Sequence, residues 1–348
     1  MALGDGKSSE PENSLRSRLL LQQQAFLAEG PPSAAVRRHR IDRLVALLFE
    51  NADALAQAML ADYGSRSPVA SVMTEIVGIG STIEYTRNNL ERWMRPRRTL
   101  PGYRLFGGVS AEVEPSPKGV VGIIGPWNFP VNLVALPAVE AFAAGNRVMI
   151  KMSEVTSHTA EVFADLAARY FDPSELDVVV GPIEVGGAQF AALPFDHLFF
   201  TGSPPSVGRL IQRAASEHLV PVTLELGGKN PVVVAQNADI DRYAGRIANA
   251  RLVNGGQVCL CPPDYVFVPP PSASRNSVRR RAQQFVEYCR LSSTRPTSRR
   301  QSTTRTTNGC WVCLRTPGRR ERTSSRSLHP EKRCRTGRPA KKSPPRLW

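Results

Sequence analysis

Cysteine is missing from the first 258 of the 348 residues. All six cysteines come later, at Cys259, Cys261, Cys289, Cys310, Cys313 and Cys334. A body of this size without cysteine has no disulfide framework, and the pattern is typical of proteins in a reducing compartment. We therefore expect a cytoplasmic protein.

Long apolar runs are also missing, because no stretch of about 18 consecutive apolar residues occurs. The N-terminus, MALGDGKSSEPENS, is polar and lacks the basic and then apolar order of a signal peptide. The sequence thus predicts no membrane span. With 41% hydrophobic residues, a chain of this length buries a large core and usually forms two domains.

Acidic residues are scarce in one part of the chain only. Residues 271–348 contain 18 arginines and 3 lysines against 3 glutamates, a net charge of +18. Residues 1–270 carry a net charge of −3, so the overall charge of +15 averages two unlike parts. We interpret the chain as a mildly acidic globular body followed by a strongly basic tail.

The basic tail has three interpretations. Clustered arginines neutralise phosphates, as in a nucleic-acid-binding arm. Cys310, Cys313, His329 and Cys334 have a spacing that a zinc site tolerates, but no apolar strand or helix surrounds them, and we predict no metal. The tail is rich in Arg, Ser, Thr and Pro without a hydrophobic period, as in an out-of-frame translation product. We favour the last interpretation and expect a disordered tail that does not bind nucleic acid.

The N-terminal part is expected to be helical. Within residues 14–61, and again within residues 69–94, apolar side chains recur every three or four positions and give each segment one core-facing stripe. Pro96, among three arginines, ends the second segment. Residues 104–115 resemble a short hairpin around a glycine pair.

From residue 119 onward, short apolar segments alternate with amphipathic ones. We predict strands at 119–125, 146–151, 176–181, 197–202 and 222–226, and helices at 137–144, 158–170, 185–193 and 207–215. A helix at 242–253 and a strand at 265–269 follow. This alternation implies right-handed crossovers and a parallel sheet with helices on both faces. Such sheets bind ligands at the carboxyl ends of their strands, here residues 125–130, 151–154, 202–208 and Gly181.

Two reactive side chains stand at the ends of apolar segments. Glu225 lies in VTLELGGKNP, just before a glycine pair, and Cys259 follows Gln257 in the glycine-rich NGGQVCL. A thiol and a carboxylate in such positions suit a nucleophile and its general base. Cys261 is the rival nucleophile.

Three further segments follow predicted strands. Asn128, in GPWNFP, either donates a hydrogen bond to a developing oxyanion or only satisfies backbone groups of its proline-bounded turn. Lys151 and Glu154, in KMSE, offer a cation and a carboxylate that suit ribose hydroxyls, although such residues are common at surfaces. TGSPPSVG, at 201–208, is a glycine-bounded turn into a helix, a geometry that suits a pyrophosphate-binding site. The sequence has no G-x-G-x-x-G fingerprint.

Five motifs in this order make the sequence resemble the aldehyde dehydrogenase superfamily. They are GPWNFP (125–130), IKMSE (150–154), LPFDHLFFTGS (193–203), LELGGKNP (224–231) and NGGQVC (254–259). The segment AGNRVMIKMSE, at 144–154, is most similar to the coniferyl aldehyde dehydrogenase branch. The resemblance covers residues 14–268, about three quarters of the chain.

The resemblance implies roles for individual residues. Cys259 matches the nucleophile whose thiolate attacks the aldehyde carbonyl, and Asn128 with the backbone amide of Cys259 would hold the oxyanion. Hydride then passes to NAD(P)+ and leaves a thioester, and Glu225 matches the general base that activates water to hydrolyse it. The G-Q-x-C spacing assigns the nucleophile to Cys259, so we expect Cys261 to be a packing residue.

The resemblance also implies cofactor contacts. Lys151 and Glu154 match residues at the adenosine ribose, where the Glu154 carboxylate would repel a 2′-phosphate, so NAD is favoured over NADP. The remaining residues expected at the cofactor are Trp127, Gly202, Ser203 and Gly208.

The predicted fold class is therefore α/β, a Rossmann-like parallel-sheet cofactor domain with N-terminal helices. The expected parts are an N-terminal helical part (1–100), the cofactor domain (101–224), the start of an incomplete catalytic domain (225–269) and the tail (270–348). In the superfamily the catalytic domain continues with an E-x-F-G-P segment at the nicotinamide ribose and a strand for homo-oligomer assembly. Residues 270–348 contain no E-x-F-G-P.

Three functions remain open at this point. The first is NAD-dependent oxidation of an aromatic or medium-chain aldehyde to the acid. The second is an inactive, truncated remnant of such an enzyme, and the third is nucleic-acid binding through the tail. The superfamily implies a homo-oligomer, but the strand that assembles it is not recognisable here.

Overall fold

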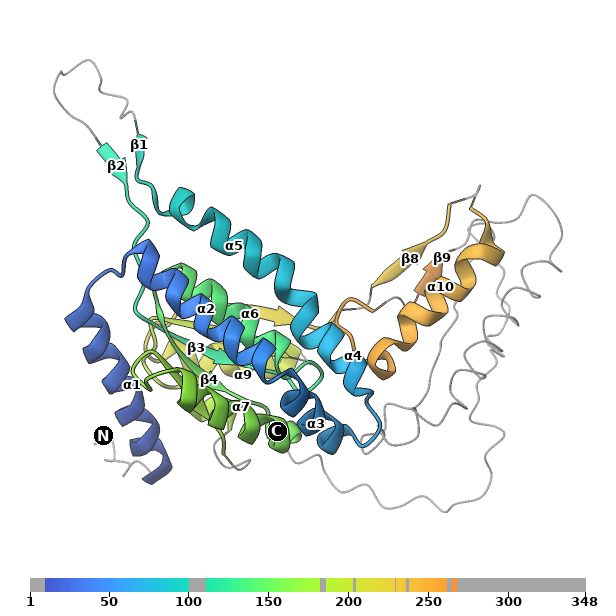
Figure 1. The fold of residues 1–348 in the computed structure, drawn as a ribbon, viewed down its shortest axis with the longest axis horizontal. Helices are drawn as coiled ribbons and strands as arrows, with labels where there is room; N and C mark the ends of the chain where they lie inside the picture. Colours follow the sequence, from blue (N-terminus) through green and yellow to red (C-terminus); the bar gives the residue numbers. More distant parts are fainter. Residues whose placement is uncertain are drawn as a thin grey trace, which may run out of the picture.

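The computed structural model describes residues 10–99, 111–181, 186–202, 205–228, 230–235, 238–261 and 265–267. Within these ranges the chain forms a layered α/β body, with a smaller strand–helix–strand unit to one side (Figure 1). The predicted α/β class with a parallel sheet is confirmed.

Five of the described strands form the central sheet, in the order β5-β4-β3-β6-β7. Their bounds are β3 Val120–Ile124, β4 Arg147–Lys151, β5 Leu176–Val179, β6 His197–Gly202 and β7 Val222–Leu226. All neighbouring pairs are parallel, so their carboxyl ends share one edge. The chain runs outward from β3 to β5 and then returns to β6 on the other side of β3. The strand order therefore reverses between β3 and β6, where open α/β sheets bind ligands.

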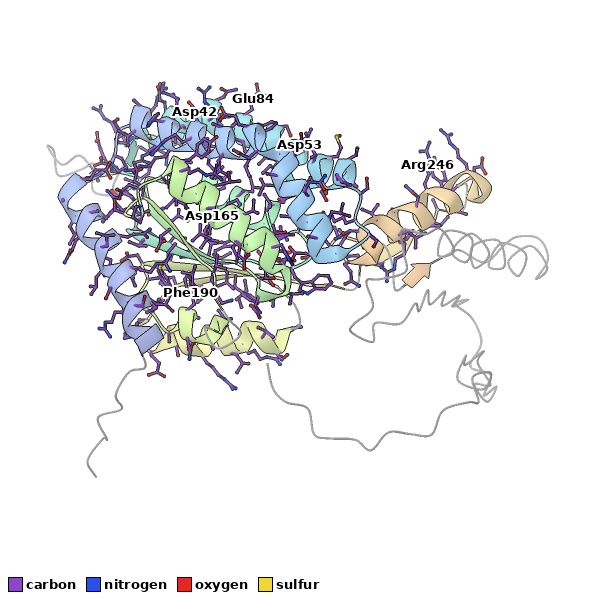
Figure 2. All side chains as sticks on the ribbon, turned by 60° about the horizontal axis from the view of Figure 1, so that its bottom comes forward. Asp42, Asp53, Glu84, Asp165, Phe190 and Arg246 are labelled. Carbon is purple, nitrogen blue, oxygen red and sulfur yellow. The ribbon has the colours of Figure 1, made fainter. Side chains whose placement is uncertain are left out.

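Helices cover both faces of this sheet, because its central strands are apolar on both sides. Every residue of β3 and β4 is buried; Val121 and Ile123 belong to one core cluster, and Val120 and Ile124 to the other. The first cluster includes α2 Ala34–Glu50, α3 Ala52–Tyr63, α5 Gly78–Met94, α6 Asn132–Ala143 and α7 Ser157–Tyr170. The second includes α1 Glu10–Glu29, α8 Gly187–Ala191 and α9 Pro205–Ser216. In Figure 2, Phe190 of α8 and Asp165 of α7 lie on opposite sides of the sheet.

The helix after β3 starts earlier than expected. Helix α6 begins at Asn132 rather than at residue 137, and Pro137 lies inside it. Proline is favoured in the first turn of a helix, which is why it suggested the start. The buried residues Val134 and Ala135 precede it on the core face, so packing against the sheet extends the helix in the N-terminal direction.

The segment 69–94 is helical but not continuous. It begins with α4 Pro68–Val72, passes through a π-helical turn, η1 Met73–Val77, and continues as α5. Strand β1 Arg97–Thr99 then pairs antiparallel with β2 Ala111–Val113. Strand β1 begins with two exposed arginines, so no apolar alternation indicated a strand there. The glycine pair expected at the hairpin turn, Gly107 and Gly108, lies outside the described residues.

A second parallel pair follows the central sheet. It joins β8 Pro231–Val233 to β9 Tyr265–Phe267 through α10 Ile240–Leu252 and the short turn η4 Val253–Gly256. Helix α10 and β9 were predicted, whereas the three-residue β8 was not. The predicted tail at 270–348 lies outside the described residues.

No single helix in the described part of the chain is long and apolar enough to cross a membrane, although α2 and α3 pass that test together as a bent pair. Their apolar stripes were predicted to face the core. Leu44, Leu48 and Leu55 are fully buried, which confirms that prediction for the centre of the stripe, whereas Val36 and Phe49 of α2 are exposed.

Candidate active site

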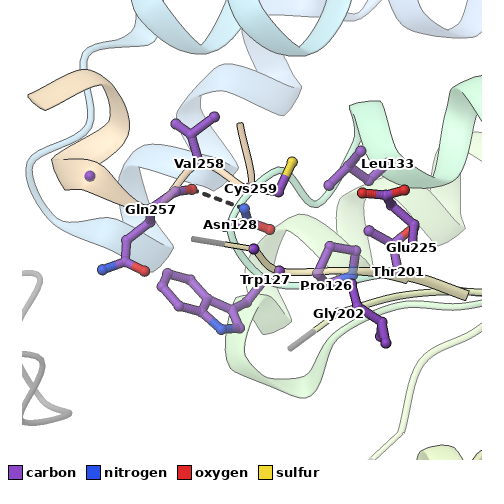
Figure 3. A pocket seen from close by; sticks show the side chains of 14 residues that line it. Pro126, Trp127, Asn128, Leu133, Thr201, Gly202, Glu225, Gln257, Val258 and Cys259 are labelled. Atoms are coloured by element: carbon purple, nitrogen blue, oxygen red, sulfur yellow. Dashed lines mark hydrogen bonds between the residues drawn. The ribbon is translucent and has the colours of Figure 1, made fainter. Parts of the chain in front are cut away.

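A pocket of about 220 Å³ lies at the carboxyl edge of the sheet, where the strand order reverses. Four chain segments line it: the β3–α6 turn, the end of β6, the end of β7 with its following glycines, and the loop after α10 (Figure 3). The lining residues that the sequence singled out are Trp127, Asn128, Gly202, Glu225 and Cys259. Residues far apart in the chain therefore meet at the predicted edge.

Asn128 lies in the turn between β3 and α6, and its side chain reaches the loop that carries Cys259. Its Nδ2 atom donates a hydrogen bond of 2.9 Å to the backbone oxygen of Gln257 (Figure 3). This bond satisfies a backbone group, but one in the Cys259 loop and not in the turn of Asn128 itself. The amide has a second N–H, so a donor also remains for an oxyanion.

Glu225 lies on β7, opposite Thr201 of β6 in the sheet register. Strand β7 is at the edge of the sheet, and its residues alternate between half-buried and exposed. Glu225 is on the exposed side, and Figure 3 shows its carboxylate at the side of the pocket across from Asn128. The carboxylate is thus accessible to water while it lines the pocket.

The loop that leads to Cys259 requires its glycines. Asn254, Gly255 and Gly256 have φ values of 51°, 62° and 80°, a left-handed backbone that glycine and, less readily, asparagine adopt. A Cβ atom at Gly256 would also lie 2.4 Å from Nη1 of Arg251. The N-G-G sequence therefore turns the chain from the end of α10 into the pocket.

Two asparagines hold this loop, and sequence analysis assigned neither a role. Nδ2 of Asn230 donates to the backbone oxygen of Cys259 over 2.6 Å. Nδ2 of Asn254 donates to the backbone oxygen of Asn128 over 2.9 Å. Both lie within the quoted motifs, but a side chain that supports a distant main chain has no sequence pattern of its own.

The rival thiol points elsewhere. Sγ of Cys261 lies 3.2 Å from the backbone oxygens of both Ala250 and Arg251, at the end of α10. A thiol can donate weakly to carbonyl groups that lack helical partners there. Cys261 does not line the described pocket, whereas Cys259 does.

Lys151 and Glu154 lie at the same edge of the sheet, one strand beyond β3. Lys151 ends β4, and Glu154 begins the short turn η3 Glu154–Thr156. Nζ of Lys151 lies 2.9 Å from Oε2 of Glu154. Burial raises the pKa of Glu154. Hydrogen bonds from its own backbone amide and from Lys151 lower the pKa by more than burial raises it, so it lies below its usual value. The partly exposed carboxylate is therefore ionised at neutral pH.

The predicted glycine turn is described in part. Gly202 ends β6 and lines the pocket. Gly208 is buried in α9, where an added Cβ atom would lie 3.1 Å from Leu226. Because Gly208 has no side chain, α9 can approach β7 closely. Ser203 lies outside the described residues. Helix α9 follows β6 in a crossover, so its N-terminus, which favours anions, is at the carboxyl edge.

These features fit a dinucleotide at the edge of the sheet. The strand order reverses there, a helix N-terminus follows β6, and Glu154 offers an ionised acceptor for hydroxyl groups. The residues that could hold such a cofactor are Trp127, Lys151, Glu154 and Gly202.

Known proteins are similar in sequence to most of this chain. The model of the aldehyde dehydrogenase family matches residues 23–287. A coniferyl aldehyde dehydrogenase from a Pseudomonas strain is 46% identical over 272 residues, which are 78% of this chain and 55% of that protein. Human aldehyde dehydrogenase family 3 member B1 is 39% identical over 254 residues, 73% of this chain and 53% of that protein. This chain thus spans about half the length of the curated relatives it matches.

Solved structures share the fold. The substrate-bound state of Staphylococcus aureus AldH gives a TM-score of 0.72 at 30% identity, over 82% of this chain and 60% of that chain. A variant of Pseudomonas syringae aldehyde dehydrogenase C, in complex with NAD+ and octanal, gives a TM-score of 0.68 at 26% identity, over 80% of this chain and 54% of that chain. By its sequence, its sheet and the residues of its pocket, this chain belongs to the aldehyde dehydrogenase family.

Proposed function

We propose that this chain oxidises an aldehyde to the carboxylic acid with NAD, and that coniferaldehyde or another aromatic aldehyde is its substrate, with medium-chain aldehydes as the second choice. The observation that carries the proposal is that Asn128, Glu225 and Cys259, from three distant segments, line one pocket at the strand-order reversal. The aromatic substrate is supported by relatives named coniferyl aldehyde dehydrogenase. The second choice is supported by the octanal complex of a structural relative.

Cys259 acts as the nucleophile in this proposal. Its thiolate forms a bond to the aldehyde carbon, and the carbonyl oxygen takes up the negative charge. The Asn128 amide and the backbone N–H of Cys259 donate to that oxygen and stabilise the charge as it develops. Bound NAD supplies the acceptor for the hydride that leaves the substrate carbon. A thioester of Cys259 results.

Glu225 acts as the general base of the second stage. Its exposed carboxylate takes a proton from a water molecule, and the resulting hydroxide attacks the thioester carbon. The carbon–sulfur bond then breaks, which releases the carboxylic acid and restores the thiolate of Cys259. The position of Glu225 at the pocket, on an exposed strand face, supports this role.

Lys151 and Glu154 contact the adenosine ribose in this proposal. The downward shift in the pKa of Glu154 keeps a negative charge where NADP would place its 2′-phosphate, which supports NAD. Trp127, Gly202, Ser203 and the helix that contains Gly208 complete the predicted cofactor site. Assembly as a homo-oligomer and a cytoplasmic location stay predictions.

A spectrophotometric assay tests the proposal. The purified full chain with NAD+ and coniferaldehyde or benzaldehyde is expected to produce absorbance of reduced nicotinamide. Cys259→Ala should abolish the signal, whereas Cys261→Ala, the matched control, should retain it. A folded chain that binds NAD+ without turnover would instead support the inactive remnant. Loss of signal in Cys261→Ala with activity in Cys259→Ala would contradict the assignment of the nucleophile.

A further inference from the structure

A fully buried carboxylate caps the helix that follows the Asn128 turn. Glu75 has 0% exposure, and its Oε2 atom accepts hydrogen bonds from the backbone N–H groups of Val131, over 3.2 Å, and Asn132, over 2.8 Å. Helix α6 begins at Asn132, and Val131 provides no side-chain cap. Glu75 therefore satisfies, from another helix, two N–H groups that an α-helix leaves without partners at its N-terminus.

A buried arginine links this carboxylate to Asn128 itself. Nη2 of Arg66 lies 2.8 Å from Oε1 of Glu75, and its Nη1 donates to the backbone oxygen of Asn128 over 3.3 Å. The guanidinium lies 5.1 Å from the ring centre of Tyr63 and 5.3 Å from that of Phe129. The Arg66 guanidinium thus contacts the Glu75 carboxylate with one nitrogen and the Asn128 backbone oxygen with another, while the aromatic rings restrict its orientation.

The turn is supported along its whole length. The hydroxyl of Tyr63 donates to the backbone oxygen of Trp127, and the side chain of Asn132 donates to the backbone oxygen of Thr74 over 2.9 Å. Together with the bonds from Arg66 and Glu75, these contacts fix backbone groups on both sides of Asn128. They act on the main chain, so they determine where the Asn128 side chain begins.

The placement of Glu75 is costly, so it calls for a reason. Burial raises its pKa, against the opposing effects of Arg66 and the two backbone amides. A buried carboxylate is tolerated only when it is paired and hydrogen-bonded, as here. Glu75 also lies in the π-helical turn η1, a rare geometry that often occurs at functional sites.

We propose that Glu75 and Arg66 are positioning residues that hold the main chain at 127–132 so that the Asn128 amide stays at the oxyanion position. Neither residue lines the pocket, and both act through Asn128. The catalytic consequence rests on the proposed function, whereas the support of the turn does not.

Two substitutions test the pair at the same volume or charge. Glu75→Gln keeps the shape, but an amide has one acceptor oxygen where the carboxylate has two, so either Arg66 or the start of α6 loses its partner. Arg66→Lys keeps the charge, but a single ammonium cannot replace the two-ended guanidinium. The matched control is Glu175→Gln. Glu175 also accepts from two arginines, Arg40 at 2.9 Å and Arg43 at 2.8 Å, and does not line the pocket.

The kinetic test uses coupling to Asn128. Glu75→Gln and Arg66→Lys should each lower kcat by about 10- to 100-fold, as a displaced catalytic group does, with KM for NAD+ changed less than about threefold. In an Asn128→Ala background, the same substitutions should lower kcat less than about twofold further, because their target is gone. An equal loss in both backgrounds, or no loss in the first, would overturn the proposal. Glu175→Gln should leave kcat unchanged.

A second test needs no turnover. Hydrogen exchange measured by mass spectrometry should become faster for the amides of Val131 and Asn132 in Glu75→Gln, while exchange in β3 and β4 stays unchanged. Exchange that rises throughout the sheet, or does not rise at the turn, would contradict a positioning role. If the wild-type chain shows no turnover but the turn loses protection, the proposed function fails and the positioning of the turn stands.

Discussion

The two sides of the pocket are built differently. On the Asn128 side, every residue of β3 and β4 is buried between two layers of helices. On the Cys259 side, Ala248 is the one fully buried residue among the residues of 230–261 whose burial is described, and Val233 and Leu260 are 77% and 76% exposed. In Figure 2, Arg246 of α10 lies well away from the main body.

The polar contacts follow the same division. Among the described residues, the ion pairs all join positions between 18 and 177. The Cys259 loop is held by hydrogen bonds to backbone oxygens instead, from the amides of Asn128, Asn230 and Asn254 and from Arg251, whose Nη1 donates to Gly256 over 2.9 Å. The comparison teaches that packing fixes one half of the pocket and a few hydrogen bonds place the other. Core substitutions should therefore reduce stability, whereas changes to these amides should reduce activity.

The largest expected effect is a loss of stability on the packed side. Phe142 is fully buried and stacks on Phe171 with a ring-centre distance of 5.5 Å, so Phe142→Ala should lower the free energy of unfolding by about 3–5 kcal/mol. Val233→Ala, on the exposed β8, should change it by less than about 0.5 kcal/mol. Urea denaturation measures both. Similar losses would mean that the two regions are packed alike.

The next effect is on catalysis and tests the residue that joins the two sides. Asn128→Ala removes the proposed oxyanion donor and the bond to Gln257, so kcat should fall by about 100- to 1000-fold. Steady-state kinetics measures this, with unfolding as the control for stability. A variant with normal kcat would leave the Asn128 side chain only its hydrogen bond to the Cys259 loop.

A smaller effect is expected for a supporting amide on the open side. Asn230→Ala removes the bond to the backbone oxygen of Cys259, which should lower kcat about tenfold by loosening the nucleophile. Asn89→Ala is the matched control, because Asn89 also donates to a backbone oxygen, that of Tyr85, but in α5. Equal kcat values for the two variants would show that the Cys259 loop does not depend on Asn230.

The smallest effect is a pH dependence of stability on the packed side. Burial raises the pKa of Glu175, but hydrogen bonds from Arg43 and Arg40 lower it by more, so the pKa lies below its usual value. Such a group stabilises the fold above its unfolded pKa, and this contribution is lost as the pH falls through the lower, folded pKa. The difference in unfolding free energy between wild type and Glu175→Gln should thus be constant near neutral pH and shrink below about pH 4.5. A difference that grows in acid would reverse the sign of the argument.

The sequence predicted the packed side better than the open side. Continuous apolar runs mark β3 and β4 because both faces of these strands are buried, and their carboxyl ends then locate Asn128 and Lys151. Strand β8 escaped notice because it has only three residues, two of them exposed, which show no periodicity. The Cys259 loop was recognisable because left-handed backbone demands its N-G-G sequence.

The supporting residues could not be predicted for a different reason. Arg66 and Glu75 are charged residues of a kind that is usually exposed, and nothing in their spacing shows that they are buried against a turn about 60 positions away. Asn230 and Asn254 act through backbone oxygens of other segments, so only the folded chain reveals their targets. Burial and distant contacts are properties of the tertiary structure.

Trapping the covalent intermediate tests the central claim, that the pocket brings a nucleophile on the open side together with a base on the edge strand β7. Glu225→Gln removes the base but not the thiol, so incubation with NAD+ and coniferaldehyde should leave an acyl group on the protein. Tandem mass spectrometry should locate it on Cys259, with one reduced nicotinamide formed per acyl group. No acyl group, or an acyl group on Cys261, would contradict the account.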